Sequence, residues 1–194
     1  MNEVEVSVEG IGTPEWLELA RSFAKAVLDE LRKDGWDLSI LLCDDAFIRG
    51  LNRQYREKDE PTDVLSFEQG DSYRNPEGEE RYLAGDIVIS LDSLARNADE
   101  NGVDREEELK RLIAHGILHL AGMDHEDNDP SRPMLVLQEE LLRKLSAGGE
   151  RRLAASSAPS FAAGALPRPS RTRLPSFPGT GPRPSAWPPT SAAR

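Results

Sequence analysis

Two periods of hydrophobic and polar positions alternate along the chain and predict a succession of strands and helices. Residues 4–8 alternate Val with Glu or Ser, which is typical of a strand with one buried face. Helically spaced apolar positions follow from 16 to 31, after Thr13-Pro14, a pair that suits the start of a helix. The nearly continuous apolar run at 36–43 predicts a second and more central strand.

The middle of the chain predicts one helix and two strands. Asp44-Asp45 suits the cap of a helix that continues through Tyr55. Residues 62–67 and 83–91 have the composition of strands, and because they are close in sequence we expect them to pair antiparallel. The polar and turn-rich segment 69–81 between them is expected to form a surface loop or a hairpin tip.

Three helices complete the predicted order. Asp92 suits the cap of a short helix at 93–100. Asp104 resembles the first residue of a capping box and opens a helix whose apolar stripe reaches Leu120. A last helix is expected from 131 to 145, and no apolar periodicity follows it. The helix that ends at Leu120 is apolar enough near its end to lie in the core.

Composition divides the chain into a predicted domain at 1–147 and a predicted disordered tail at 148–194, rich in Pro, Ser, Ala and Arg. The tail holds seven Arg and one Glu, so of the chain's 24 basic and 35 acidic residues the domain keeps 17 and 34. Such an acidic domain is not expected to bind polyanions in general, because long-range repulsion opposes their approach. A nucleic-acid substrate would therefore require a local basic group or a metal ion.

The sequence also limits redox chemistry and location. Cys43 is the one cysteine, which excludes an intramolecular disulfide and a Cys-rich zinc ribbon, and its apolar surroundings predict an inert buried thiol. The first residues lack the basic and apolar regions of a signal peptide, and no stretch approaches the roughly 20 apolar residues of a membrane span. We expect a cytoplasmic protein with no membrane contact.

All three histidines of the chain lie in one short run, with the spacing H-x3-H-x5-H. His115 and His119 are four residues apart, which on a helix stacks their imidazoles on one face. Gly122 follows and can end the helix in the left-handed conformation, so that the chain turns back and brings His125 toward the first pair. Three neutral imidazoles suit one Zn²⁺ ion with a fourth position open for water, the arrangement of a catalytic site.

The same run matches H-x-x-x-H-x-x-G-x-x-H, the zinc-binding pattern of a class of metalloproteases. In those enzymes a Glu follows the first His and serves as the general base. Here that residue is Gly116, which cannot accept a proton. The pattern therefore predicts a metal site without proteolytic activity, and Zn²⁺ there would suit phosphodiester cleavage.

Two residues outside the run are candidates for the same chemistry. Arg56 lies in the break after the second predicted helix, and its guanidinium can bind a phosphate through two donors. An ordinary surface ion pair with Glu57 or Asp59 is the alternative. Asp86 interrupts an apolar strand, where it can accept a hydrogen bond from a ligand imidazole or simply cap the strand.

Three segments together resemble one family, the YbeY-type bacterial endoribonucleases or rRNA maturation factors. The segments are LNRQYREKDEPTDVLSF at 51–67, LAGDIVIS at 83–90 and HGILHLAGMDH at 115–125, and the resemblance covers about residues 3–146. It implies a single α+β domain with a small mixed four-stranded sheet packed by helices and a central metal-binding helix. Met123 stands where the family usually has Tyr, which removes a hydroxyl but no ligand.

The resemblance further implies one zinc ion held by His115, His119 and His125, and a functional arginine at Arg56. It implies cleavage of single-stranded RNA, maturation of the 16S rRNA 3′ end and late-stage 70S ribosome quality control, with the ribosome or its small subunit as partner. A non-catalytic ribosome assembly factor with a structural zinc is the alternative function. The oligomeric state, the cleavage site and the nucleophile stay open.

Overall fold

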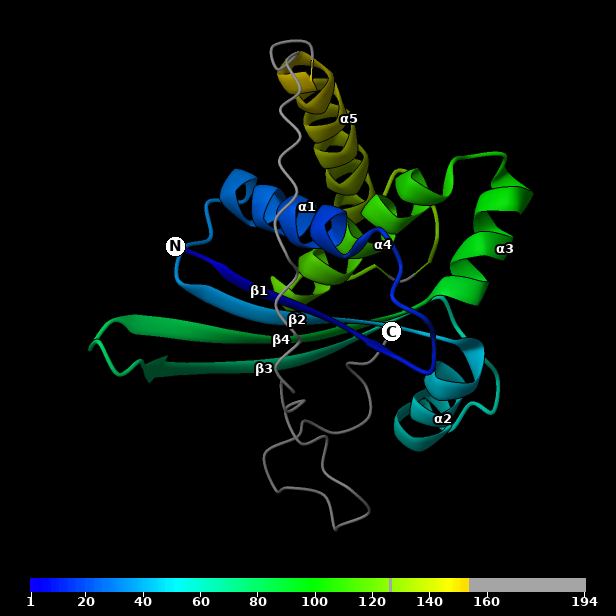
Figure 1. Cartoon of the computed structure of the whole chain (residues 1–194), viewed down its shortest axis with the longest axis horizontal. Helices are drawn as coiled ribbons and strands as arrows, with labels where there is room; N and C mark the ends of the chain where they lie inside the picture. Colours follow the sequence, from blue (N-terminus) through cyan, green and yellow to red (C-terminus); the bar gives the residue numbers. More distant parts are fainter. Residues whose placement is uncertain (126, 154–194) are drawn as a thin grey trace, which may run out of the picture.

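The computed structural model describes residues 1–125 and 127–153. This part of the chain forms five helices and four strands (Figure 1). In order, they are β1 Glu3–Glu9, α1 Leu17–Glu30, β2 Trp36–Cys43, α2 Asp45–Arg56, β3 Val64–Arg74, β4 Glu80–Ser90, α3 Leu91–Asn101, α4 Arg105–Leu120 and α5 Pro133–Leu153. The predicted α+β class is confirmed.

The four strands form one mixed sheet in the order β1-β2-β4-β3. β1 pairs with β2 and β2 with β4 in parallel, so helices cross over between these strands. β3 and β4 form the antiparallel pair that their closeness in sequence predicts. β3 is therefore an edge strand, and β2 and β4 are central.

Helices cover the two faces of the sheet unequally. Figure 1 shows α1 and α4 against one face and α2 against one end of the other. Because neighbouring strand residues point to opposite faces, Ile40 and Ile87 join the larger core under α1 and α4, whereas Leu41 and Val88 join a smaller cluster under α2. The larger core contains most of the buried surface of α4, so the predicted core position of this helix is confirmed.

Gly116 allows α4 to lie close to the sheet. A Cβ at this position would come within 2.8–3.0 Å of three side-chain carbons of Ile87, distances that carbon atoms do not normally reach. Ile87 is fully buried on β4 and has no free space to move into. A glutamate following His115 would thus point into the core, which supplies a structural reason for the missing protease base.

The segment 69–81 is more regular than the sequence predicted. β3 continues to Arg74 and β4 begins at Glu80, so most of the expected loop is a two-stranded hairpin that projects beyond the other strands (Figure 1). From Glu68 to Arg74 every residue is exposed. Strands with no buried face lack apolar alternation, and the pattern that identifies a strand is therefore missing.

Two helix starts also differ from the prediction. α1 begins at Leu17, after a turn at Glu15 and Trp16, so Thr13-Pro14 lies before the helix rather than at its cap. The N-cap of α3 is Ser90, whose hydroxyl accepts from the Ser93 N–H at 3.2 Å. The Asp92 carboxylate instead accepts from the N–H of Asp45 at the start of α2.

The last helix continues past the predicted domain boundary, since α5 extends to Leu153 rather than ending near residue 145. The remainder of the predicted tail, from 154 to 194, lies outside the described residues. Among the helices in the described ranges, none is both long enough and apolar enough to cross a bilayer.

Candidate metal centre

The C-terminal half of α4 and the turn after it carry all three histidines. Asp104 caps the start of this helix by accepting from the Glu106 N–H at 2.8 Å. At the other end, Gly122 has φ +83°, the N–H of Gly122 bonds to the His119 carbonyl, and the N–H of Met123 bonds to the Leu118 carbonyl. This pair of bonds is a Schellman motif, which reverses the chain as the sequence predicted.

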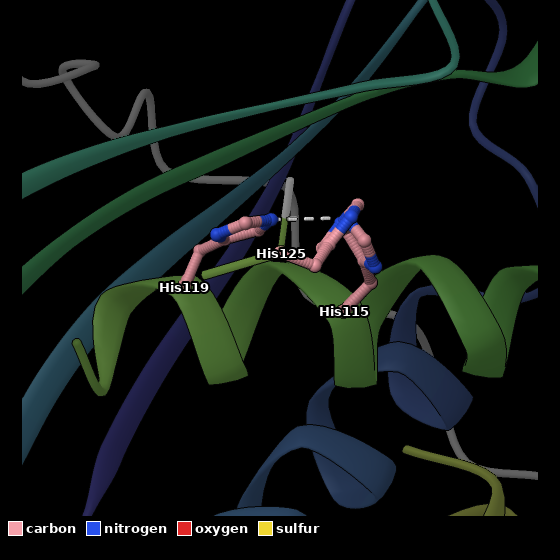
Figure 2. A group of neighbouring side chains, drawn as sticks. All are labelled: His115, His119 and His125. Carbon is pink, nitrogen blue, oxygen red and sulfur yellow. Dashed lines mark hydrogen bonds between the residues drawn. The ribbon is translucent and has the colours of Figure 1, made fainter. Parts of the chain in front are cut away.

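The reversal brings the three imidazoles together (Figure 2). His115 Nε2 lies 3.1 Å from His119 Nε2 and 3.5 Å from His125 Nε2. One nitrogen from each ring can be chosen so that all lie within 4.8 Å of one another. The residues predicted as ligands from their spacing therefore gather at one point, with their Nε2 atoms facing inward.

Each imidazole makes a hydrogen bond through Nδ1, the ring nitrogen that faces away from the other two rings. Nδ1 of His115 lies 2.9 Å from the side-chain oxygen of Gln138, Nδ1 of His119 lies 3.1 Å from the Met123 carbonyl, and Nδ1 of His125 lies 2.9 Å from the Asp127 carbonyl. Carbonyl and amide oxygens only accept, so Nδ1 of each neutral ring carries the proton. The lone pair of each ring is then on Nε2, the atom that faces the other two rings.

The surroundings of His115 and His119 favour the neutral form of their rings. Burial lowers the pKa of His115 below its ordinary value, against the effect of the Gln138 hydrogen bond. Burial and the two neighbouring imidazoles lower the pKa of His119 to about 4. A metal ion at neutral pH would therefore displace few protons from His115 and His119. Three converging nitrogen donors match the ligand number and type that catalytic zinc sites use.

Arg56 is the last residue of α2, and one edge of its guanidinium finds no hydrogen-bond partner in the part of the chain that the structure describes. The side chain is half-buried, and its Nε and Nη2 atoms are buried without a hydrogen bond among the described residues. Asp59, one of the two ion-pair partners considered for it, binds Arg49 instead, at 2.9 and 3.0 Å. Burial lowers the pKa of the Arg56 guanidinium, which indicates that its charge is poorly solvated.

Asp63 connects Arg56 to the metal centre electrostatically. Burial lowers the pKa of the Arg56 guanidinium and of the His115 imidazole, and the charge of the Asp63 carboxylate opposes part of both shifts. The side chain accepts from the N–H of Val64 at 2.8 Å and from the Asn97 amide at 3.0 Å, which fixes it where β3 begins. Arg56 and the histidines therefore belong to one electrostatic neighbourhood, although they come from different elements.

Asp86 does not support the imidazoles. Its carboxylate accepts from the Ser39 hydroxyl and from the Gln69 amide. Since Ile87 next to it faces α4, the Asp86 side chain lies on the opposite face of the sheet. The expected role of Asp86 as a partner for a ligand nitrogen is therefore wrong: Asp86 belongs to a polar cluster between strands.

The residue that sequence reasoning missed is Gln138 on α5. It is 5% exposed, although the residues at helical spacing around it, Met134, Leu141 and Leu142, form a buried apolar stripe. A polar residue within an apolar stripe has to find a hydrogen-bond partner inside the protein. That interruption of the pattern was the available signal, and its partner is His115.

Known proteins resemble this chain over most of its length. A family model described as Endoribonuclease YbeY matches residues 3–146. A protein from Treponema denticola named Endoribonuclease YbeY is 64% identical over 121 residues, which span 62% of this chain and 78% of that protein. A Treponema pallidum protein with the same name is 51% identical over 152 residues, 76% of this chain and 95% of the relative.

A solved structure agrees with these matches. The solution structure of a Thermotoga maritima protein superposes with a TM-score of 0.55 at 28% sequence identity, over 82% of this chain and all of that one. The matched residues 3–146 include every strand, the three histidines and Arg56. The chain therefore belongs to the endoribonuclease YbeY family.

Proposed function

We propose that this protein is a zinc-dependent endoribonuclease of the cytoplasm that cleaves single-stranded RNA. The observation that carries the proposal is the arrangement of three Nε2 lone pairs at one point, each fixed by an acceptor behind the ring. The family and its named relatives support RNA as the substrate. The resemblance supports the finer role, which is maturation of the 16S rRNA 3′ end and late-stage 70S ribosome quality control.

The protein's own groups divide the work between binding and positioning. Held by His115, His119 and His125, one Zn²⁺ would polarise a phosphoryl oxygen and lower the pKa of a bound water toward about 7. The Nδ1 partners keep each ring in one tautomer and one orientation. Glycine at position 116 supplies no general base, and Arg56 is the residue of this chain that we propose to bind the phosphate and stabilise its charge.

Arg56 supplies the phosphate contact in this proposal. Its Nε and Nη2 atoms lie on one edge of the guanidinium, and that edge matches two phosphate oxygens. Because both nitrogens are buried, the Arg56 side chain or the loop after α2 has to shift when RNA binds. An unpaired guanidinium edge costs free energy in the free protein, and a bound phosphate would remove that cost.

Metal content and RNA cleavage, measured on the same preparations, test the proposal. Wild type is expected to hold one zinc and to cleave a single-stranded RNA, and His115→Ala and His125→Ala are expected to lose both. Arg56→Ala is expected to keep the zinc and lose cleavage, with Arg53→Ala, an exposed arginine on the same helix, as the matched control. Cleavage that persists in folded His115→Ala would refute the proposal.

The ends of the products identify the nucleophile. Attack by a ribose 2′-hydroxyl leaves 2′,3′-cyclic phosphate ends, whereas attack by water leaves simple monophosphates. Both reactions are compatible with the three-histidine site, because a zinc ion can activate either hydroxyl group.

A non-catalytic ribosome assembly factor is the second candidate. The acidic domain favours it, since 34 carboxylates against 17 basic groups suit a protein partner better than bare RNA. It predicts that the protein sediments with small ribosomal subunits even when the three histidines are replaced. It also predicts that the purified wild type, loaded with zinc, leaves single-stranded RNA intact.

A further inference from the structure

His115 differs from the other two candidate ligands in what holds its Nδ1 atom. His119 and His125 bind backbone carbonyls four and two residues further along the chain, in the segment that follows α4. His115 binds a side chain, Gln138, that lies 23 residues along the chain on α5. The orientation of this one imidazole therefore depends on a second helix and on the chemistry of one replaceable residue.

The orientation of the Gln138 amide is itself fixed. Its nitrogen donates to Glu139 Oε1 at 3.2 Å, and the same carboxylate oxygen accepts from Arg111 Nη1 at 2.7 Å. A carboxylate accepts and cannot donate, so the amide nitrogen has to face Glu139 and the amide oxygen has to face His115. A chain of donors and acceptors thus runs from Arg111 to the ring of His115.

Arg111 also joins the two helices that carry this chain of bonds. It lies on α4, one turn before His115, and its Nε atom is 3.4 Å from the Glu108 carboxylate. Its Nη1 atom reaches Glu139 on α5. Both ends of the arrangement are therefore anchored on α4, with α5 supplying the two residues between them.

We propose that Gln138 is a positioning residue that sets which nitrogen of His115 carries the proton and thereby directs the Nε2 lone pair to the metal. In solution a neutral imidazole can place its proton on either nitrogen, and a proton on Nε2 would block metal binding. The buried amide oxygen has no other donor among the described residues, and His115 Nδ1–H satisfies it. The inference rests on the proposed metal-dependent function and adds a residue to it.

Gln138→Met tests the inference most directly, because Met has nearly the same size but cannot accept the hydrogen bond. Imidazole nitrogen NMR of the metal-free protein at neutral pH reports which ring nitrogen of His115 is protonated. Wild type is expected to show the proton on Nδ1, and Gln138→Met is expected to move a large fraction of it to Nε2. Zinc affinity, measured by competition with a chelator, should fall about 10–100-fold.

Two variants separate positioning from packing. Gln138→Glu keeps an acceptor and is expected to keep the proton on Nδ1 and a zinc affinity at least equal to that of wild type. Glu139→Ala changes a residue whose side chain is 54% exposed and should not endanger folding, yet it frees the Gln138 amide to rotate. It is expected to mix the two tautomers of His115. Gln69→Met, on the other face of the sheet, is the matched control. It should change neither the position of the proton on His115 nor the zinc affinity.

The outcomes distinguish this inference from the proposed function. If folded Gln138→Met and Glu139→Ala both keep the proton on Nδ1 and the wild-type zinc affinity, the inference is overturned while zinc binding stands. If wild type binds no zinc but the tautomer of His115 follows residue 138, the positioning effect is supported and the metal-dependent function fails. A purely structural role for Gln138 would lower the melting temperature without moving the proton.

Discussion

Gly116→Ala tests whether close packing of α4 on the sheet explains the glycine beside the first ligand. The added methyl group would lie 2.8, 2.9 and 3.0 Å from Cγ2, Cδ1 and Cγ1 of Ile87. Ordinary carbon contacts are about 3.5–4.0 Å, so one partner has to recede by roughly 0.5–1 Å. Ile87 is completely buried and β-branched, and it cannot rotate away freely.

Two effects of opposite sign decide the free energy of unfolding. Crowding a packed core costs about 1–3 kcal/mol. Replacing a glycine within a helix by alanine returns about 0.8–1.0 kcal/mol through backbone entropy. The expected result is a net loss of roughly 1 kcal/mol, with a ceiling of about 2 kcal/mol. Urea unfolding followed by far-UV circular dichroism measures it.

Gly50 on α2 is the matched control. It is a helical glycine too, but a Cβ there would meet nothing within 4 Å. Gly50→Ala should therefore gain about 0.5–1 kcal/mol, so the two substitutions are expected to have opposite signs. Equal stabilisation by both would refute the packing explanation. In the double variant with Ile87→Val, part of the Gly116→Ala loss should be recovered beyond additivity.

Three further predictions concern other parts of the molecule. Because burial and the neighbouring imidazoles lower the pKa of His119 to about 4, this ring takes up its proton at a higher pH in the unfolded chain than in the folded protein. The metal-free protein should therefore lose stability as the pH falls from 6.5 toward 4, by at most about 1.4 kcal/mol per pH unit for this proton. In urea titrations, His119→Asn should flatten that loss. Arg81→Ala should cost about 3 kcal/mol by removing the guanidinium partner of the Asp37 carboxylate, to which the Tyr73 hydroxyl still donates, while zinc content stays unchanged. Since burial raises the pKa of Cys43 to about 12, a thiol reagent should modify it only after unfolding, and rapid reaction with the native protein would contradict this.

The gathering of the three histidines was predictable because its information is local. His115 and His119 are four residues apart on a helix, Gly122 adopts the left-handed conformation that reverses the chain, and His125 follows three residues later. Spacing and backbone conformation are therefore enough to predict that the three rings meet. The strands with a buried face and the antiparallel pairing of β3 with β4 were predictable for the same kind of reason. Each prediction depended on residues that are near one another in sequence.

What the sequence left undetermined depends on contacts between distant segments. From Glu68 to Arg74 every residue of β3 is exposed, so the pairing of this part of β3 with β4 leaves no mark in the apolar pattern. The partner of Asp86 depended on which face of the sheet α4 covers. The interaction of Gln138 with His115 required α5 to lie against α4, which no periodicity reveals.

The hydrogen bonds that the three histidines make through Nδ1 also affect how the site can change by mutation. Two of the Nδ1 acceptors are backbone carbonyls, which remain whatever side chains the chain acquires. The third belongs to Gln138, and a glutamine codon becomes a glutamate codon through a single base change. A carboxylate behind His115 would make this ring a stronger donor to a metal ion. One heritable step is therefore enough to alter how tightly the centre holds its metal, without touching a ligand.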